Sequence, residues 1–353
     1  MRAVLIVNPT ATSTTTAGRD LLAHALKSRL ELTVEHTRHR GHGGEIAQAA
    51  VQDGVDLVVV HGGDGTVSNV VNGLLGKPGQ LPTGHVPALA IVPGVSANVT
   101  ARSLGIPPGP IDATNQLIWL LDKYGPEKKW RRIGLIDCGE QWAVLNAGMG
   151  VDAEAVAKVE AQREKGKKVT PTRYITAAVR ATIAYSRKQP RLTVELPGRK
   201  PIPGVYFVFV SNSSPWTYAD DRPMCTNPGT SFEAGLGVFG VTRLKVVPSL
   251  RLVAQMFSKQ PKIEGDQVVR DDNADCVRVT CADPPMASQF DGDYLGVREQ
   301  MAFRAVPDAL DVVAPPLKNF PTCGDRRMWP KALVRVPGSV VQTIKGFGNR
   351  SLK

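Results

Sequence analysis

The sequence predicts an α/β N-terminal domain with a parallel sheet, followed by a C-terminal domain that is mostly an antiparallel β-sandwich. Three observations support this fold class. Short apolar segments alternate with amphipathic helical segments up to residue 125, the later chain is strand-rich and interrupted by glycine and proline, and 353 residues exceed what one core ordinarily needs. We expect an α/β domain at 1–125, a β-rich domain at 126–316, and a basic tail at 317–353.

The N-terminal domain opens with a repeating strand and helix pattern. Short apolar runs rich in β-branched residues are typical of buried parallel strands, and they lie at 3–7, 32–35, 57–60 and 89–92. Between them, apolar residues recur at helical spacing, as in Val67, Val70, Val71 and Leu74. Strands alternating with helices predict parallel pairing with right-handed crossovers.

The C-terminal domain has a different texture. A turn at Cys138-Gly139-Glu140 separates 130–137 from 141–146, which predicts a hairpin. Further strands are expected at 205–210, 238–246, 277–281 and 301–305. One helical insertion at 153–186 interrupts them, breaking near Gly166 and restarting at Thr170-Pro171, where threonine can cap and proline suits a first helical turn.

Composition narrows the class of protein. Hydrophobic residues make up 42% and charged residues 21% of the chain, which excludes a disordered or collagen-like protein. The longest apolar run, 205–210, is far shorter than the roughly 20 residues of a membrane-spanning helix. The five cysteines are scattered without a CxxC pair, which disfavours a disulfide framework or a zinc cluster. We therefore expect a cytoplasmic protein.

The net charge of +11 is concentrated in two regions. Residues 158–200 hold twelve Lys/Arg against three Asp/Glu, and residues 324–353 hold seven against one. Basic stretches on an otherwise acidic body suit an anionic surface, although charge runs by themselves more often form a solvated helix face and a loose tail. Aromatic residues are only 6% and are not interleaved with this charge, which favours a membrane surface over nucleic acid.

The strongest motif is a glycine-rich turn between a predicted strand and a predicted helix, Gly62-Gly63-Asp64-Gly65-Thr66. Glycine permits positive φ and lets backbone N–H groups approach phosphate oxygens, and a helix N-terminus adds further donors. Thr66 can cap the helix or contact phosphate, and Asp64 can orient donors, hold Mg²⁺ or accept a proton. A plain turn would also need its glycines, but the acidic residue among them favours a nucleotide phosphate site.

Two more predicted strands end in polar loops that belong to the same sheet edge. Asn8-Pro9-Thr10 follows the first strand, and a loop at 93–98 containing Ser96 follows the fourth. In open parallel sheets, ligands bind outside the carboxyl ends of the strands. The dinucleotide pattern GxGxxG after the first strand and the pattern GxxxxGK[ST] are both missing from the sequence, which disfavours a Rossmann dehydrogenase and a P-loop NTPase. His39 and His42 read as part of an exposed basic loop rather than a metal site.

In combination and order, these motifs resemble the diacylglycerol kinase catalytic-domain family, which includes bacterial soluble lipid kinases and is related to sphingosine and ceramide kinases. The resemblance covers roughly residues 1–315, and it also rests on segment 146–152 and on Asp291-Gly292-Asp293. It implies a fold like those of diacylglycerol kinases and NAD kinases, with an ATP-binding kinase domain at 1–125 and a lipid-substrate domain at 126–316.

The resemblance assigns roles to individual residues. Asp293 would be the general base at a lipid hydroxyl, with Asp291 supporting it. Asp64 would be associated with a nucleotide-bound Mg²⁺. The implied ATP contacts are Asn8, Pro9, Thr10, Thr37, Gly62, Gly63, Asp64, Gly65, Thr66, Val67, Ser68 and Ser96.

The implied activity is ATP- and Mg²⁺-dependent transfer of a phosphoryl group to a lipid hydroxyl, with diacylglycerol giving phosphatidic acid. Such an enzyme would be cytoplasmic and peripherally membrane-associated, would bind no nucleic acid, and could form a homodimer. Two alternatives stay open: a kinase of a soluble substrate, as NAD kinases are, and a catalytically weak lipid-binding relative. Departures at Val95, Val99 and Asp293, where the family usually has Gly, Asp and Glu, favour the weak relative, and Glu233 to Leu236 only loosely resembles a segment associated with a structural Mg²⁺.

Overall fold

A computed structural model describes residues 1–11, 15–80, 84–95, 97–150, 153, 189–219, 222–258 and 261–316. Except for Ala153, the expected helical insertion at 153–186 lies outside these ranges, as do the basic tail and Ser96. The predicted charge concentrations therefore fall mostly on residues that the structure does not describe.

The N-terminal domain is built on a parallel sheet, as its alternating pattern predicts. Its strands pair in the order β2-β1-β3-β4. The two central apolar runs, β3 and β4, are buried along their whole length, whereas β2 at the edge alternates between half-buried and exposed residues. The strands are β1 (Arg2–Val7), β2 (Glu31–His36), β3 (Leu57–Gly62) and β4 (Ala88–Pro93).

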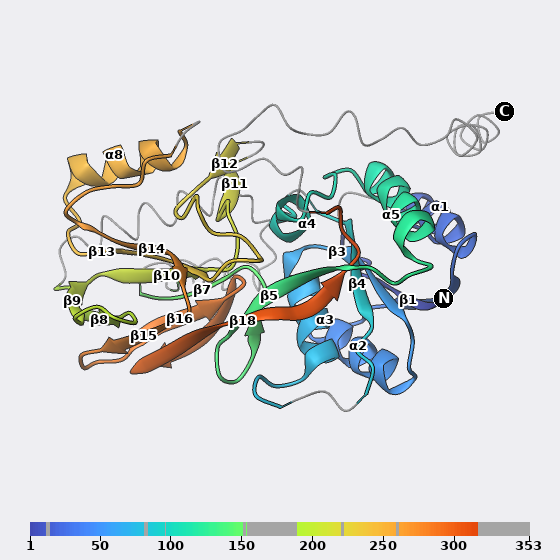
Figure 1. Ribbon diagram of the computed structural model, residues 1–353, viewed down its shortest axis with the longest axis horizontal. Coiled ribbons are helices and arrows are strands. Elements are labelled where there is room, and N and C mark those ends of the chain that lie inside the picture. Colours follow the sequence, from blue (N-terminus) through green and yellow to red (C-terminus); the bar gives the residue numbers. More distant parts are fainter. Residues whose placement is uncertain are drawn as a thin grey trace.

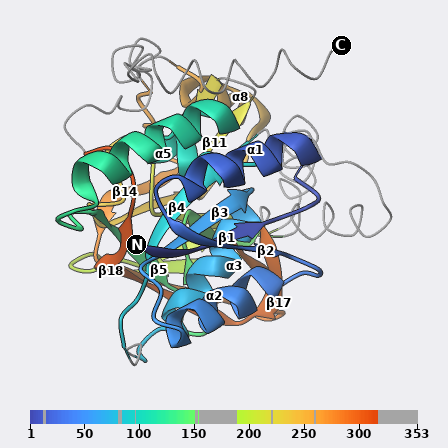
Figure 2. The same cartoon turned by 90° about the vertical axis from the view of Figure 1, so that its right-hand side faces the viewer.

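Helices cover both faces of this sheet (Figure 2), with α1 and α5 on one face and α2 and α3 on the other. The predicted apolar stripe of α3 is buried, and Thr15 caps α1 by accepting a hydrogen bond from the N–H of Gly18. The helices are α1 (Thr16–Lys27), α2 (His42–Gln52), α3 (Asp64–Leu75), α4 (Val99–Ser103) and α5 (Pro110–Tyr124).

The C-terminal part contains a six-stranded antiparallel sheet, which confirms the predicted fold class. Its strands follow the order β14-β13-β10-β7-β16-β17. They are β7 (Asn146–Gly150), β10 (Phe207–Ser211), β13 (Leu236–Val241), β14 (Val268–Ala274), β16 (Met286–Phe290) and β17 (Asp293–Arg298). A short pair, β11 (Thr217–Ala219) and β12 (Arg222–Met224), lies beside them (Figure 1).

One long strand joins the two parts of the chain. β18 (Gln300–Val312) pairs with β15 near its start and with β4 at its end, where Val312 lies opposite Leu89. The N-terminal strands thereby continue into a ten-stranded sheet (Figure 1). Its remaining members are β5 (Arg131–Asp137), β6 (Trp142–Ala143), β8 (Leu192–Glu195), β9 (Ile202–Val205) and β15 (Cys276–Cys281).

Three predicted strands differ from the structure. The second hairpin strand shrinks to β6, because the N–H groups of Val144 and Leu145 bind a carboxylate instead of a neighbouring strand. The run at 205–210 is divided between β9 and β10. The strand predicted at 238–246 ends at Val241, and helix α8 (Val246–Met256) begins instead, with Pro248 in its first turn, where the missing N–H is not needed.

Among the described residues, no helix combines the length and apolar character needed to cross a bilayer. Cys225 is disulfide-bonded, which differs from the expectation of reduced cysteines, whereas Cys138, Cys276 and Cys281 are free. Spacing along the sequence gives no signal for such a bond, because disulfide partners are brought together by the fold.

Candidate functional site

Three loops meet at the carboxyl edge of the parallel sheet. The side-chain amide of Asn8, which follows β1, donates to Thr66 Oγ1 at 3.1 Å. The N–H of Gly94, which follows β4, donates to the carbonyl of Gly62 at 2.9 Å. The loops that the sequence placed at one edge are therefore in direct contact.

Two glycines of the turn at the start of α3, Gly62 and Gly63, are required by close packing. A Cβ on Gly62 would lie 2.8 Å from Thr66 Cβ, and a Cβ on Gly63 would lie 2.7 Å from Val95 Cγ2. By contrast, a Cβ on Gly65 meets no atom of the described residues within 4 Å. Gly62, Gly63 and Gly65 are not among the positive-φ glycines, so the sequence-based argument from positive φ is wrong for this turn.

Of the other predicted nucleotide contacts, Thr10, Thr37 and Pro9 lie near the sheet edge, and Val67 lies in the core. Thr10 folds back on Asn8, donating to its Oδ1 from the backbone N–H at 3.0 Å and from Oγ1 at 2.7 Å. Thr37 lies near Thr66, because a Cβ on Gly43 would be 3.8 Å and 3.7 Å from their methyl groups. Pro9 is exposed at the same edge, whereas the Val67 side chain is buried in the core.

Asp64 binds the start of the next helix. Its two carboxylate oxygens accept hydrogen bonds from the N–H groups of Val99 at 3.0 Å and Thr100 at 2.8 Å, which are the first residues of α4. Each oxygen keeps a further lone pair, so the residue fits an Mg²⁺ held mainly by phosphate and water.

A buried aromatic and an arginine lie beside this carboxylate. The Arg102 guanidinium stacks on the Tyr218 ring, 3.5 Å from its centroid. Burial raises the pKa of Tyr218 and the nearby Asp64 adds to this, while Arg102 acts in the opposite direction. Tyr218 belongs to no motif, because it reaches Asp64 and Arg102 from a strand more than 100 residues away.

Asp291 is enclosed by hydrogen-bond donors. Its carboxylate accepts from the N–H groups of Val144 at 2.7 Å, Leu145 at 2.8 Å and Asn146 at 3.0 Å, and from Ser68 Oγ at 2.7 Å. Burial raises the pKa of this carboxyl, and the four donors oppose that shift. Its φ of 45° is stabilised by these contacts. Asp291 is therefore held in place by four donors that occupy its carboxylate oxygens.

Asp293 lies two residues further, at the start of β17. Its Oδ1 is 2.9 Å from Arg40 Nη2, and its side chain is 25% exposed. The turn between the two aspartates is shaped by Gly292, whose φ is +82° and whose N–H donates to Gln289 Oε1 at 3.1 Å. The anchored Asp291 thus fixes where the more accessible Asp293 stands.

The histidine pair has a carboxylate neighbour that sequence analysis missed. The ligand atoms of His39, His42 and Glu45 lie within 4.8 Å of one another, and His39 Nε2 is 3.8 Å from Glu45 Oε2. However, His42 Nδ1 accepts the N–H of Arg38 at 3.1 Å, which places the ring proton on Nε2. This arrangement does not favour a metal, because His42 would have to give up that hydrogen bond to ligate through Nε2.

A second acidic segment is satisfied by an arginine. Glu233 accepts from Arg131 Nε at 2.7 Å, and the Arg131 side chain is only 9% exposed. The loosely matching segment at Glu233 to Leu236 therefore has a cationic partner from the protein itself.

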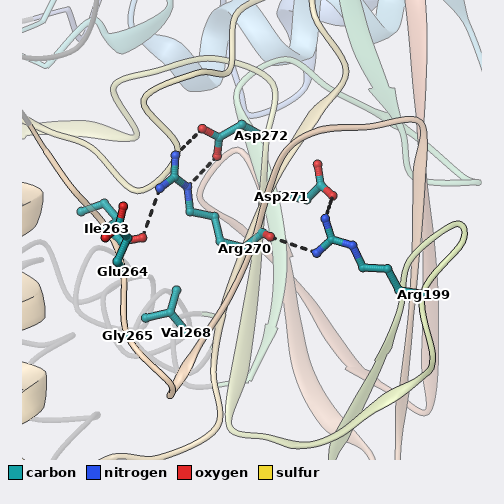
Figure 3. A pocket seen from close by; sticks show the side chains of 8 residues that line it. All are labelled: Arg199, Ile263, Glu264, Gly265, Val268, Arg270, Asp271 and Asp272. Atoms are coloured by element: carbon teal, nitrogen blue, oxygen red, sulfur yellow. Dashed lines mark hydrogen bonds and ion pairs between the residues drawn. The ribbon is translucent and has the colours of Figure 1, made fainter.

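An open cavity of about 470 Å³ lies elsewhere, beside β14 (Figure 3). Four of its charged groups pair within its walls: Arg270 forms a bidentate pair with Asp272, and Arg199 binds Asp271 at 2.6 Å. Asp272 in turn accepts from the N–H of Gly229, and Arg270 keeps the pKa of Asp272 low. This cavity is built for internal pairing and does not include the predicted site residues.

Part of the chain matches a known protein family and its members. Residues 2–121 match the family described as "Diacylglycerol kinase catalytic domain". The predicted family resemblance is confirmed. A protein of Chromohalobacter salexigens named "Probable lipid kinase YegS-like" is 31% identical over 136 residues, covering 38% of this chain and 40% of that protein. A "Diacylglycerol kinase" of Bacillus subtilis is 34% identical over 114 residues, covering 30% of this chain and 34% of that protein.

The fold extends beyond the matched segment. A crystal structure of a diacylglycerol kinase from Bacillus anthracis superposes with a TM-score of 0.64, covering 89% of this chain and 97% of that one at 18% identity. At that identity the likeness shows the fold alone. The sequence matches to the curated relatives span less than half of their length, all within the lipid kinase and diacylglycerol kinase groups.

Proposed function

We propose that this protein is an ATP-dependent lipid kinase that transfers the γ-phosphoryl group to the hydroxyl of diacylglycerol, giving phosphatidic acid. The observation that carries this proposal is the hydrogen bond between Ser68 and Asp291. It holds the Asp291-Gly292-Asp293 turn against α3, the helix that begins at the glycine-rich turn. This contact supports a site in which the N-terminus of α3 would bind phosphate near the accessible carboxylate of Asp293.

In this proposal the loops at the sheet edge hold ATP. The first N–H groups of α3 have no partner within the helix and face the edge where phosphates would lie. Thr10, Thr37 and Thr66 supply hydroxyl groups beside them, and Ser96 is retained from the family resemblance. Bound Mg²⁺ would neutralise phosphate charge, and the Asp64 carboxylate would offer it the oxygen ligands that it prefers.

The chain's own contribution to the reaction is positioning and proton removal. Phosphoryl transfer needs an attacking hydroxyl in line with the leaving group and stabilisation of the charge on the equatorial oxygens. Asp293 would accept the hydroxyl proton, because it is the accessible carboxylate of the turn. Asp291 would hold that turn and would not take the hydroxyl proton, because its oxygens already accept four hydrogen bonds.

The remaining assignments complete the proposal. The domain at 1–125 would bind the nucleotide and the domain at 126–316 the lipid. The protein would work in the cytoplasm at an anionic membrane surface, which its concentrated basic charge suits.

One observation favours a weaker catalyst. The Val95 side chain lies against Gly63. It therefore covers the glycine-rich turn at 62–66, the proposed phosphate turn, where a glycine would leave it open. A lipid-binding relative with little activity is therefore the second candidate.

A single assay separates the candidates. Protein, Mg²⁺ and γ-labelled ATP are incubated with mixed micelles containing diacylglycerol, or with NAD in place of the lipid. The proposal expects label in phosphatidic acid. Label only in NADP would assign a soluble substrate, and binding to diacylglycerol vesicles without transfer would assign the weak relative.

A further inference from the structure

An ion pair connects the two parts of the proposed site across most of the sequence. Arg40 Nη2 lies 2.9 Å from Asp293 Oδ1, although the residues are 253 positions apart. The Arg40 side chain is 65% exposed, so the guanidinium reaches Asp293 from the solvent side. An arginine therefore stands directly at the carboxylate proposed to accept the hydroxyl proton.

The segment that carries Arg40 runs along α3. A Cβ on Gly43 would lie 3.7 Å from Thr66 Cγ2, and one on Gly44 would lie 2.9 Å from the carbonyl oxygen of Asn69. Because Thr66 and Asn69 belong to the first two turns of α3, the segment that follows Arg40 packs along the N-terminal half of this helix. The neighbourhood of Arg40 thus includes both the phosphate turn and Asp293.

The pairing has a chemical cost for the proposed reaction. A carboxylate oxygen that accepts a charge-assisted hydrogen bond is occupied and less able to receive a proton. A triphosphate offers the same guanidinium a more highly charged partner with oxygens that suit bidentate binding. Because the Arg40 side chain is 65% exposed, its guanidinium has room to turn toward such a partner.

We propose that Arg40 exchanges partners: it pairs with Asp293 when no nucleotide is bound, and with the terminal phosphate when a nucleoside triphosphate arrives, which releases Asp293. This inference rests on the proposed function. In the transfer step, the substrate hydroxyl oxygen forms a bond to the γ-phosphorus while the bond from that phosphorus to the β–γ bridging oxygen breaks. The electron pair of that bond leaves with ADP, and the hydroxyl proton passes to Asp293. Arg40 then faces the charge on the equatorial oxygens.

The test is a double-mutant cycle on the affinity for a non-hydrolysable ATP analogue with Mg²⁺, measured by calorimetry. Arg40→Ala is expected to weaken binding about tenfold or more, the loss of a charge-assisted contact, and Arg40→Lys to weaken it less. The matched control Arg38→Ala removes an exposed arginine from the same segment and is expected to change affinity about twofold at most. Thermal unfolding of each variant checks that the fold is intact.

The sign of the coupling decides the mechanism. With partner exchange, Asp293→Asn tightens analogue binding more in the wild-type background than in Arg40→Ala, because only the wild type must first break the ion pair. An arginine that stays on Asp293 screens its charge, so the gain would then be larger in Arg40→Ala, and that result overturns the proposal. Equal affinities of Arg40→Ala and Arg38→Ala would overturn it as well. If the analogue follows the predicted cycle but wild type labels no lipid, the proposed function fails while the exchange stands.

Discussion

Ser68 Oγ lies 2.7 Å from Asp291 Oδ2, and this contact connects α3 to a turn 223 residues away in the chain. The serine side chain is buried, and the aspartate receives three backbone N–H groups from the segment between β6 and β7. Helix α3 and the β-rich part of the chain therefore share one hydrogen-bonded centre.

Removing the serine hydroxyl should loosen that centre. We expect Ser68→Ala to lower the free energy of unfolding by about 1–3 kcal/mol, because the buried carboxylate loses one donor. Denaturant unfolding measures the loss. Ser28→Ala, which removes an exposed hydroxyl bonded to the Ala25 carbonyl, should change stability by about 0.5 kcal/mol or less. Equal effects of the two substitutions would show that the contact is not formed.

The buried carboxylate should also give a distinct pH signature. Burial raises the folded-state pKa of Asp291 above its ordinary value of 3.8, so its contribution to stability is fully present below that value and is lost as pH rises through the folded pKa. Asp56 has the opposite sign, because a hydrogen bond from Lys128 lowers its pKa. Its contribution is present above the ordinary value and is lost as pH falls.

Unfolding free energies of wild type, Asp291→Asn and Asp56→Asn between pH 3 and pH 8 test these signs. The advantage of wild type over Asp291→Asn should shrink with rising pH, while its advantage over Asp56→Asn should grow. Parallel curves for the two variants would contradict the burial of Asp291.

The glycine-rich turn should tolerate a methyl group at one position and not at another. Gly62→Ala would bring its Cβ to 2.8 Å from Thr66 Cβ, and we expect a loss of about 1–3 kcal/mol of unfolding free energy from overpacking. Gly65→Ala faces open space within a helix, where alanine is favoured by about 0.5–1 kcal/mol. Chemical denaturation of both variants would reveal an error if Gly65→Ala were the less stable one.

Val95 offers a way to raise nucleotide affinity. Because its side chain lies over Gly63, Val95→Gly should uncover the phosphate turn and lower the Kd for an ATP analogue. We expect a gain of several-fold, limited by the added flexibility of the loop. Val86→Gly, on the loop preceding β4, serves as the control for a general effect of valine removal. An unchanged Kd would place the phosphates away from Gly63.

Local sequence patterns predicted the parallel strands and the amphipathic helices of the N-terminal domain. The parallel strands and the α3 stripe follow directly from apolar runs and helical spacing, and the three loops meet because parallel strands end at one edge. The strand predicted through Val246 failed because β-branched residues resemble a strand even where a helix begins. The predicted strand at 141–146 is interrupted at Val144 and Leu145, because their N–H groups bind the carboxylate of a residue almost 150 positions away.

The sequence predicts which residues belong to the candidate site, but not the contacts that these residues make. Motif order identified Asp291 and Asp293, but which of them is enclosed follows only from three-dimensional packing. Arg40 and Tyr218 carry no motif and reach the site through long-range contacts. Glu45 could have been noticed, because it lies one helical turn after His42 on the same face.

The most direct test of the account is the transfer of labelled γ-phosphate to diacylglycerol by wild type, Asp293→Asn and Asp293→Glu at saturating ATP. The account predicts that Asp293→Asn lowers kcat by about 10²–10⁴-fold, since the proton acceptor is lost. Nucleotide affinity should stay the same or increase. Asp293→Glu keeps a carboxylate at this position and should retain activity. Undiminished transfer by Asp293→Asn would contradict the assignment of Asp293 as the base.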